Sequence, residues 1–523
     1  MKLTLIDGNR RIEIGYTTPT LLSSLFAEKG VEFALPCGGK GRCLKCRVHV
    51  EGEADPPDAR ERALLGESDL AAGVRYACMT TVTGDVTVTL PVRSGLQTGN
   101  GGMRIQSEGV IREIPKDPWA EGSGAAVDIG TTTVAGYLYD FTSGTLLASR
   151  SLPNPQGIYG ADVVTRIEKS LAGERAGLAA SVRGCINTLL GEMCADAGIT
   201  PGEIGGVVVT GNTAMCYLLT ARDPYKLSRS PFIADFLFGE WFEPDALGLC
   251  TLRARVYVMR GASAFVGGDI TAGMLATGLC EQNEKALLAD IGTNGEMALW
   301  TGTELLCCAT AAGPAFEGVG ISCGMTAREG AISRVTLRGH TVYAETIGGG
   351  HAEGICGSGL IDAVAAYVKL GVIDETGYLD EDADEEGYLT DAGELRVGQT
   401  DVVLTQKDIR AVQLAKSAIC AGMETLLDEA GLTIEEIGVV YLAGGFGTVL
   451  NAESAEAIGL LPVGFAQKTV AVGNAAGMGA GEVLRSGEML RRSEELAGRA
   501  RTVALAESPV FMERFVENMQ FSR

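Results

Sequence analysis

The sequence of 523 residues has few of the features that mark membrane proteins or nucleic-acid-binding proteins. It contains no run of about 18 uncharged apolar residues, so no segment is expected to span a bilayer. Positive charge is also scarce: the sequence has 43 Lys and Arg residues against 66 Asp and Glu residues, which gives a net charge of −23. A surface of that sign repels nucleic acid and anionic lipid. We therefore expect neither nucleic acid nor a membrane among the partners.

Histidine is scarce as well, with 3 residues, whereas cysteine is abundant, with 14. The sequence begins Met1-Lys-Leu-Thr-Leu-Ile-Asp-Gly, which alternates like a strand and lacks the apolar core of a secretory signal. A cytoplasmic location is the resulting expectation. Thiols in that compartment stay reduced unless a metal or catalysis uses them, so disulfides are not expected.

Glycine is unusually frequent. The 72 glycines are roughly twice ordinary usage, follow no three-residue period, and accompany 46% hydrophobic residues. This combination excludes a collagen-like chain and a disordered one, and it indicates many glycine turns on a packed α/β frame. At roughly 100 to 200 residues per domain, the length predicts about three or four domains.

Four cysteines are spaced as a group. Cys37, Cys43 and Cys46 form a Cys-x5-Cys-x2-Cys pattern, and Cys78 follows far downstream. Three thiolates on one loop and a fourth from a distant segment are typical of a [2Fe-2S] cluster. Glycines inside the loop let the backbone turn its N–H groups toward sulfur. The alternative is a zinc site, but structural zinc sites usually combine two short Cys-x2-Cys pairs, and this sequence has one.

The segments around these cysteines have the alternation or periodicity of four strands and one helix. We expect the strands at 2–6, 11–16, 46–51 and 85–91, and the helix at 19–29. Residues 1–92 resemble the β-grasp ferredoxins, in the bacterial and adrenodoxin-like branch. That resemblance implies a cluster that carries one electron at low potential. The other ten cysteines form no second Cys-x2-Cys and are interpreted mainly as packing residues.

After a Gly-, Ser-, Pro- and Asn-rich segment at 93–123, which we expect to be a flexible linker, the chain repeats itself. Residues 125–139 read as strand, tight turn and strand around Asp128. The same pattern returns at 287–300 around Asp290, and Asp-Ile-Gly-Thr is identical in both copies. A turn rich in Gly and Thr presents N–H and hydroxyl donors to phosphate, and an Asp at the strand end can hold Mg²⁺ or orient water. One copy alone would fit an ordinary structural hairpin equally well.

A longer unit of helix, buried strand and glycine turn repeats too. The first copy spans 186–213 and ends in Gly211-Asn212-Thr213, and the second spans 423–448 and ends in Gly444-Gly445-Phe446-Gly447. Two copies of one α/β unit are therefore predicted, each beginning with an Asp-bearing hairpin. Because the pattern occurs twice, a phosphate-binding function common to both turns is favoured over two unrelated structural turns.

From residue 124 to about 500, the chain resembles the superfamily of actin, sugar kinases and heat-shock chaperones, in which two ribonuclease-H-like lobes close on ATP. The resemblance implies lobes at 124–280 and 281–523, and Asp128 and Asp290 as catalytic residues that share Mg²⁺ binding and water orientation in an undecided division. The implied nucleotide-binding residues are Gly130, Thr131, Thr132, Thr133, Gly211, Asn212, Thr213, Gly292, Thr293, Asn294, Gly295, Gly444, Gly445, Phe446 and Gly447.

A ferredoxin placed ahead of an actin-like ATPase is a narrow combination, and it resembles the reductive activators of corrinoid enzymes. Matching stretches include Asn154-Pro-Gln156, Phe265-Val-Gly-Gly-Asp269, Ala312-Gly-Pro-Ala-Phe-Glu317-Gly and Gly354-Ile-Cys-Gly-Ser-Gly-Leu360. The resemblance implies ATP-dependent one-electron reduction of Co(II) to Co(I) on a corrinoid protein of a methyltransferase system. It also implies an external electron donor and a homodimer.

Two other functions stay open at this point. One is ATP-coupled electron transfer to another low-potential acceptor, and the other is a small-molecule kinase or chaperone-like ATPase with a redox-sensing ferredoxin. Asp269 has two interpretations, a helix cap and a metal or phosphate ligand. Longer relatives insert a middle domain before the first lobe, and because Asp128 follows the ferredoxin closely, we expect that domain to be missing here.

Overall fold

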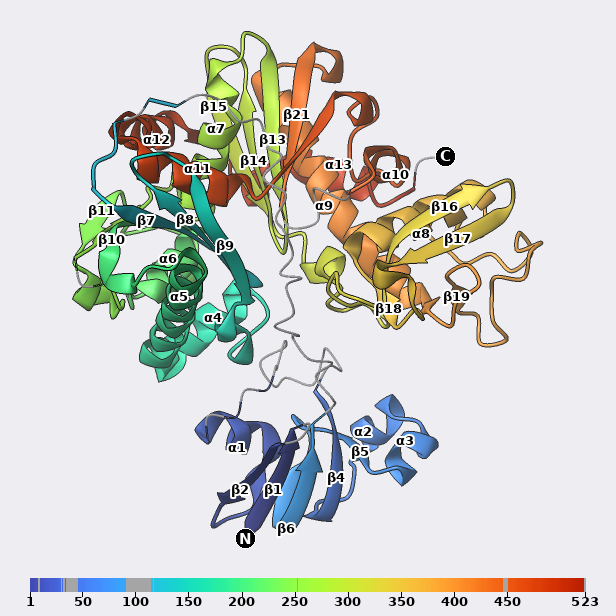
Figure 1. Ribbon diagram of the computed structural model, residues 1–523. Helices are drawn as coiled ribbons and strands as arrows, with labels where there is room; N and C mark the ends of the chain where they lie inside the picture. The colour runs from blue at the N-terminus through green and yellow to red at the C-terminus, as the bar shows by residue number, and fades with distance from the viewer. Residues whose placement is uncertain are drawn as a thin grey trace.

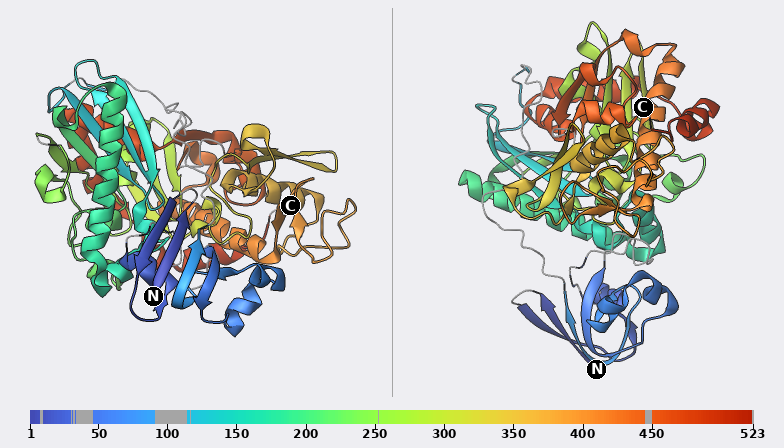
Figure 2. Two further views of the ribbon diagram at one scale, coloured as in Figure 1. Left: turned by 60° about the horizontal axis from the view of Figure 1, so that its bottom comes forward. Right: turned by 90° about the vertical axis from the view of Figure 1, so that its right-hand side faces the viewer.

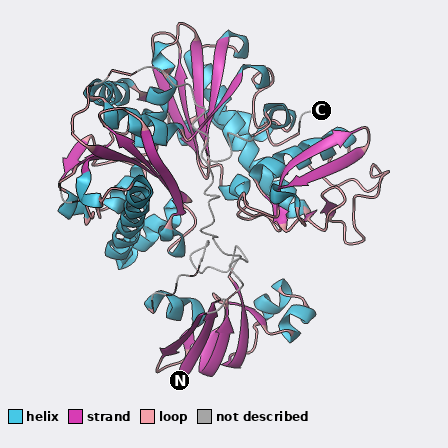
Figure 3. Ribbon diagram, viewed as in Figure 1, coloured by secondary structure: helices cyan, strands magenta, loops and turns pink. Residues whose placement is uncertain are grey.

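The computed structural model describes residues 1–7, 10–29, 31, 33, 46–90, 114–115, 117–251, 253–444 and 450–521. These residues contain both helices and strands, and the strands form several separate sheets (Figures 1 and 3). No helix in the described part of the chain is both long and apolar enough to cross a membrane.

The N-terminal unit is a sheet of parallel and antiparallel strands, with a short helix packed against one face. Its strands are β1 (Lys2–Asp7), β2 (Arg10–Gly15), β3 (Thr20–Leu21), β4 (Arg47–Ala54), β5 (Val74–Tyr76) and β6 (Thr81–Thr89). Its helices are α1 (Leu22–Glu28), α2 (Ala59–Leu64) and α3 (Glu67–Ala71). The spatial order is β2-β1-β6-β4-β5, with β3 beside β6. This order, with β1 parallel to β6, is the predicted β-grasp arrangement.

The core of this unit lies between the sheet and α1. Leu3 and Val88 from the sheet pack with Phe26 of the helix, and all three are at most 1% exposed. The four predicted strands are confirmed. The helix predicted over 19–29 begins only at Leu22, because the two preceding residues pair with β6.

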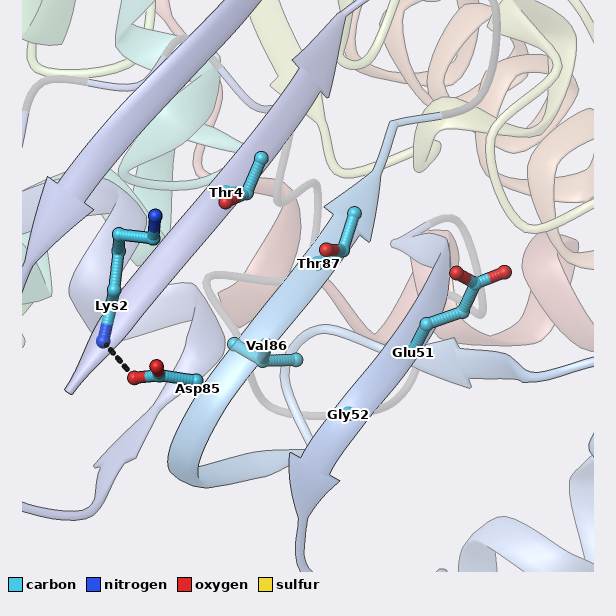
Figure 4. A pocket seen from close by; sticks show the side chains of 7 residues that line it. All are labelled: Lys2, Thr4, Glu51, Gly52, Asp85, Val86 and Thr87. Carbon is cyan, nitrogen blue, oxygen red and sulfur yellow. Dashed lines mark hydrogen bonds between the residues drawn. The ribbon is translucent and has the colours of Figure 1, made fainter.

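A shallow depression of about 330 Å³ lies on this sheet, over strands β1, β6 and β4 (Figure 4). The backbone N–H of Lys2 donates to Asp85 at 2.8 Å at one end of it, which ties the start of β1 to β6. The lining residues are Lys2, Thr4, Glu51, Gly52, Asp85, Val86 and Thr87. None of the predicted site residues lies among them.

The second unit is a six-stranded sheet in the order β11-β12-β10-β7-β8-β9. Its strands are β7 (Ser123–Ile129), β8 (Thr133–Asp140), β9 (Leu146–Pro153), β10 (Ile204–Gly211), β11 (Glu240–Phe242) and β12 (Arg255–Val258). Three helices, α4 (Val163–Lys169), α5 (Arg175–Ala197) and α6 (Thr213–Leu219), accompany it. The long helix α5 packs against β8 and β9, as the views in Figures 1 and 2 show.

The third unit repeats this plan in the order β22-β21-β13-β14-β15-β23. Its strands are β13 (Lys285–Ile291), β14 (Gly295–Trp300), β15 (Leu305–Thr310), β21 (Ile437–Ala443), β22 (Thr469–Gly473) and β23 (Arg501–Thr502). In both sheets an antiparallel three-strand run is joined by a parallel strand, β10 beside β7 and β21 beside β13. The predicted duplication is therefore confirmed in the order and direction of five strands of each sheet, whereas the sixth strand, β11 or β23, lies at opposite edges of the two sheets.

Two helices lie between the two sheets, namely α7 (Gly268–Thr277) and α11 (Ala475–Arg485). Side chains alternate along a strand, so each strand serves two cores. In β7, Val127 belongs to the core under α5, whereas Ala126 faces α7 and α11. The two central helices approach so closely that a Cβ on Gly479 would lie 2.0 Å from the carbonyl oxygen of Ala272. Glycine is therefore required at this crossing.

The remaining elements extend the third unit. A subdomain over residues 331–404, drawn in yellow and orange in Figure 1, contains β16 (Ala331–Arg338), β17 (Thr341–Thr346), β18 (Gly354–Ile355), α8 (Gly357–Leu370), β19 (Leu395–Arg396) and β20 (Val403–Leu404). The other helices are α9 (Gln406–Ala430), α10 (Ala452–Ala457), α12 (Gly487–Arg499) and α13 (Pro509–Glu517). Helices α8 and α9 pack on the third sheet's outer core.

Candidate nucleotide and cluster sites

Both predicted phosphate turns are tight hairpin turns. The N–H of Gly130 donates to the carbonyl of Thr133 at 2.9 Å between β7 and β8. The N–H of Gly292 donates to the carbonyl of Asn294, also at 2.9 Å, between β13 and β14. Each turn directly follows the strand that carries the predicted aspartate, Asp128 or Asp290. The two turns are thus equivalent points of the two repeated sheets.

The two predicted glycine turns are equivalent as well. Gly211 has φ +154°, and a Cβ there would lie 2.7 Å from the carbonyl oxygen of Ile129. Gly444 has φ +110°, and its Cβ would lie 2.4 Å from the carbonyl oxygen of Ile291. Each glycine therefore passes over the last residue of an Asp-bearing strand, where a side chain does not fit. Gly445, Phe446 and Gly447 lie outside the described residues.

The residues after Gly211 reach the first turn. Asn212 caps α6 by accepting the N–H of Met215 at 2.9 Å, and its amide donates to the Thr131 hydroxyl at 3.4 Å. The Thr213 hydroxyl donates to the carbonyl of Ser263 at 2.7 Å. The predicted glycine turn Gly211-Asn212-Thr213 and the first phosphate turn are thus brought together.

Two buried side chains support the first turn from behind. The amide of Asn154 donates to the carbonyl of Gly130 at 2.8 Å. The guanidinium of Arg166 donates to the carbonyl of Thr131 at 2.6 Å and to that of Gly160 at 2.8 Å. Arg166 is 1% exposed, and burial lowers its pKa to about 10. Sequence reasoning did not assign Arg166 a role, although it follows the Asn154-Pro-Gln156 stretch closely.

Four carboxyl groups gather at the ends of these strands. Burial raises the pKa of Asp128 to about 7, the Asn474 amide opposes that rise, and the charge of Asp290 adds to it. Burial also raises the pKa of Asp290 and of Asp269 to about 7, with further contributions from neighbouring carboxylates. The pKa of Glu296 is raised for the same reasons. Crowded, desolvated carboxylates of this kind are stabilised by a cation.

Asp269 is not the predicted helix cap, because Gly267 is the N-cap of α7 and no side-chain capping hydrogen bond is present, and its role as a metal or phosphate ligand stays a prediction. It lies in the first turn of α7 and accepts the N–H of Ile270 at 2.9 Å, and its charge raises the pKa of Asp290 and Glu296. In the described part of the chain, no three His, Cys, Asp or Glu side chains converge closely enough to hold a metal ion by themselves. Mg²⁺ characteristically uses one or two carboxylates and completes its shell with phosphate oxygens and water. The carboxylates of Asp128 and Asp290 fit a Mg²⁺ ion that is held in this way.

Two side chains link the second unit to the third across this site. The amide of Asn474, the N-cap of α11, donates to a carboxylate oxygen of Asp128 at 2.9 Å. Glu317 accepts hydrogen bonds from the hydroxyls of Thr132 in the first turn and Thr293 in the second. Neither partner residue was predicted, because each comes from a segment distant in sequence from Asp128.

The second site lies in the N-terminal unit. Cys46 and Cys78 are 1% and 9% exposed, and their Sγ atoms lie 3.2 Å apart. The N–H of Ala77 donates to the carbonyl of Cys46 at 2.9 Å, which fixes the two segments together. Thiols side by side from distant segments fit two ligands of one metal centre. Cys37 and Cys43 lie outside the described residues.

Most of the other ten cysteines are packing residues, as predicted, because seven of them are buried. Burial raises the pKa of Cys185 and Cys194 to about 11, so these thiols are protonated at neutral pH. Cys250 is exposed, and Cys280 and Cys323 are partly exposed.

Comparison with known proteins accounts for all three units. Residues 4–83 match the 2Fe-2S iron-sulfur cluster binding domain, residues 123–282 the RACo middle region, and residues 284–523 the C-terminal domain of RACo, the ASKHA domain. The corrinoid activation enzyme RamQ of Eubacterium limosum is 30% identical over 97% of this chain and 97% of its own length. The chain belongs to the family of reductive activators of corrinoid proteins.

Two further similar proteins support this family assignment. The [Co(II) methylated amine-specific corrinoid protein] reductase of Methanosarcina barkeri is 35% identical over 40% of each chain. A solved structure of a reductive activator for a corrinoid, iron-sulfur protein has a TM-score of 0.72 and 29% identity, and the match covers 99% of this chain and 98% of that one. The fold class predicted from sequence, a ferredoxin followed by a duplicated ATPase of the actin and sugar kinase type, is therefore confirmed.

One expectation about the family is wrong. The chain does not lack a middle domain, because residues 123–282 match the RACo middle region. In this chain that region is the first of the two repeated sheets with its helices. The close spacing of Asp128 to the ferredoxin misled the prediction, since the middle region begins where the first lobe begins.

Proposed function

We propose that this chain uses ATP to drive the transfer of one electron to the cobalt of a corrinoid protein, reducing Co(II) to Co(I). The observation that carries the proposal is the union of two sites in one chain. A pair of neighbouring buried thiols, Cys46 and Cys78, precedes two equivalent Asp-bearing turns that Glu317 links. The membership of the chain in a family of corrinoid activators supports the same function.

The N-terminal unit serves electron transfer in this proposal. Cys37, Cys43, Cys46 and Cys78 hold a [2Fe-2S] cluster, which supplies one electron per cycle and is recharged by an external donor. The burial of Cys46 and Cys78 keeps water away from their sulfur atoms. Their own packed core, formed by residues 3–90, holds the two segments in register.

The two repeated units serve ATP binding and hydrolysis. Hydroxyl and N–H groups of the Gly130 to Thr133 and Gly292 to Gly295 turns bind phosphate oxygens, and the Gly444 to Gly447 turn receives the adenosine. Asp128 and Asp290 hold Mg²⁺ and orient the attacking water, with Asp269 and Glu296 beside them. The hydrogen bond that the Asn474 amide donates to Asp128 lowers the pKa of that carboxyl group, and so favours the ionised form that burial disfavours.

ATP is required because reduction to Co(I) demands a lower potential than a ferredoxin cluster provides. Electron transfer alone would run uphill. A protein that closes on nucleotide and binds one state of its partner more tightly shifts that equilibrium by the difference in binding free energy. Hydrolysis then returns the chain to its starting state.

We further propose domain boundaries at 1–92, 93–123, 124–280 and 281–523, for ferredoxin, linker and the two ATPase lobes. The partner is the corrinoid protein of a methyltransferase system, and the functional unit is a cytoplasmic homodimer. Of the two alternative functions, neither gains support from a particular contact of the described residues.

Metal analysis and ATP hydrolysis on the full chain test the two halves of the proposal separately. Anaerobically purified protein is expected to contain about two irons and two sulfides per chain and to hydrolyse MgATP. Zinc in place of iron would overturn the electron-transfer half. Iron without any ATP hydrolysis, alone or with a corrinoid partner, would overturn the ATPase half.

A further inference from the structure

Glu317 occupies a singular position in the nucleotide site. Its Oε2 atom accepts the hydroxyl of Thr132, which belongs to the β7 to β8 turn. Its Oε1 atom accepts the hydroxyl of Thr293 at 3.0 Å, which belongs to the β13 to β14 turn. One carboxylate therefore joins the two turns that the proposed function assigns to the phosphates.

These hydrogen bonds compete with phosphate binding. A threonine hydroxyl has a single proton to donate, so Thr132 and Thr293 cannot serve Glu317 and a phosphate oxygen at once. A carboxylate and a phosphate are also alike in charge and repel one another. Phosphate groups that bind between the turns must therefore displace the Glu317 side chain.

The backbone on either side of Glu317 directly contacts neighbouring segments, so a rearrangement at Glu317 affects those segments. Glu317 ends a short 3-10 helix, η7 (Pro314–Glu317), whose preceding residue Gly313 donates its N–H to the carbonyl of Thr293 at 2.9 Å. Gly318 follows with φ +77°, and a Cβ there would lie 2.6 Å from the backbone nitrogen of Met325. Neither glycine tolerates replacement without strain.

The same short helix touches the 331–404 subdomain. Helix α8 begins at Gly357, where a Cβ would lie 1.9 Å from the carbonyl oxygen of Phe316. Phe316 itself is 2% exposed and packs in the core shared by α8, α9 and the third sheet. A shift of η7 is therefore transmitted to the start of α8 through direct backbone contact.

We propose that Glu317 is the positioning residue through which phosphate binding is communicated to the 331–404 subdomain. Its carboxylate and the ATP phosphates compete for the Thr132 and Thr293 hydroxyls, and its release moves η7 against the first turn of α8. This inference rests on the proposed function, because it takes the two turns as the phosphate site.

The test compares Glu317→Ala with the wild-type chain and with a matched control, Glu304→Ala, whose exposed side chain lies between β14 and β15 in the same lobe. We expect Glu317→Ala to bind MgADP and MgATP about tenfold more tightly, because a competing acceptor has been removed. In the wild-type chain, nucleotide should change hydrogen exchange at 314–318 and 357–361. In Glu317→Ala this change should be lost, and ATP hydrolysis should no longer support cobalt reduction.

Other outcomes overturn the inference in distinguishable ways. Unchanged nucleotide affinity with lost hydrolysis would make Glu317 a catalytic residue, and weaker affinity with a lowered melting temperature would make it structural. Glu317→Gln keeps one acceptor oxygen and should fall between wild type and Glu317→Ala in affinity. A wild-type chain that binds no nucleotide would contradict the proposed function as well.

Discussion

Asp128 and Asp290 are the residues on which the proposed chemistry depends most. Burial and neighbouring carboxylates raise the pKa of both to about 7, and each is the penultimate residue of a strand that leads into a phosphate turn. A carboxylate in such surroundings gains most from a bound Mg²⁺ ion, because the ion relieves both its desolvation and the repulsion from its neighbours.

Asp128→Asn and Asp290→Asn should each lower the rate of ATP hydrolysis by about 100-fold or more, because each removes a charge needed for Mg²⁺ or water. Nucleotide binding should persist, since the turns themselves remain. Steady-state hydrolysis and titration with a fluorescent nucleotide provide the two measurements. Asp391→Asn, at an exposed loop position, is the control and should behave as wild type. Full hydrolysis by either variant would remove that aspartate from the mechanism.

The raised pKa values also predict a pH dependence of stability. Asp128, Asp269 and Asp290 have folded pKa values of about 7, above the ordinary 3.8, so the folded chain binds more protons than the unfolded one between those values. Stability without ligand should therefore fall as pH rises from about 4 to about 7. MgADP requires the ionised forms, so it should raise the melting temperature more at pH 8 than at pH 6. An equal increase at both pH values would contradict these shifts.

Among the elements, the paired strands and their glycine crossings decide the geometry of the site. Strand β10 beside β7, and β21 beside β13, place Gly211 and Gly444 directly over the ends of the Asp-bearing strands. The same glycine-to-strand contact occurs in both units, so the two halves of the site follow one structural rule, in which a glycine crosses the end of the Asp-bearing strand.

Gly444→Ala tests that rule. The new Cβ would lie 2.4 Å from the carbonyl of Ile291 at a φ of +110°, so we expect a loss of about 2 kcal/mol in the free energy of unfolding and weaker nucleotide binding. Denaturant titration and a binding assay measure the two effects. Gly191→Ala, in the interior of α5 with open space around it, should leave nucleotide binding unchanged and raise the free energy of unfolding by up to about 1 kcal/mol, because alanine favours a helix more than glycine does. Equal behaviour of the two variants would show that the crossing tolerates a side chain.

Sequence patterns predicted the elements well because each hairpin is local. The strand, turn and strand around Asp128 and Asp290 lie within about fifteen residues, where alternation and glycine turns are visible. The supporting contacts are not local. Thr132 meets Glu317 and Asp128 meets Asn474 only after the two sheets pack on α7 and α11. The start of α1 was misplaced for a related reason, since pairing with β6 overrides its helical pattern.

In the whole molecule, the proposed cluster site and the proposed nucleotide site belong to units with separate hydrophobic cores. The ferredoxin core draws on residues 3–90, whereas the two sheets of the ATPase share a third core around α7 and α11. A defect in one site should therefore leave the other intact, although the proposed function needs both.

Cys46→Ser makes this separation measurable. It removes a cluster ligand, so cobalt reduction should be abolished, whereas affinity for MgATP should stay within about twofold of wild type, because no residue of the ATPase is changed. Cys250→Ser, at an exposed thiol outside the ferredoxin, is the matched control and should retain both. Retained ATP-dependent function in Cys46→Ser would favour a kinase or chaperone-like ATPase with a sensory ferredoxin.

The most direct test of the central claim is to follow the Co(I) absorbance band anaerobically, after the chain is mixed with a Co(II) corrinoid protein, a low-potential reductant and MgATP. The account predicts that the band grows only when ATP and the intact chain are both present, and that it is absent with Cys46→Ser. A band that forms equally without ATP, or no band with any corrinoid partner, would contradict the account.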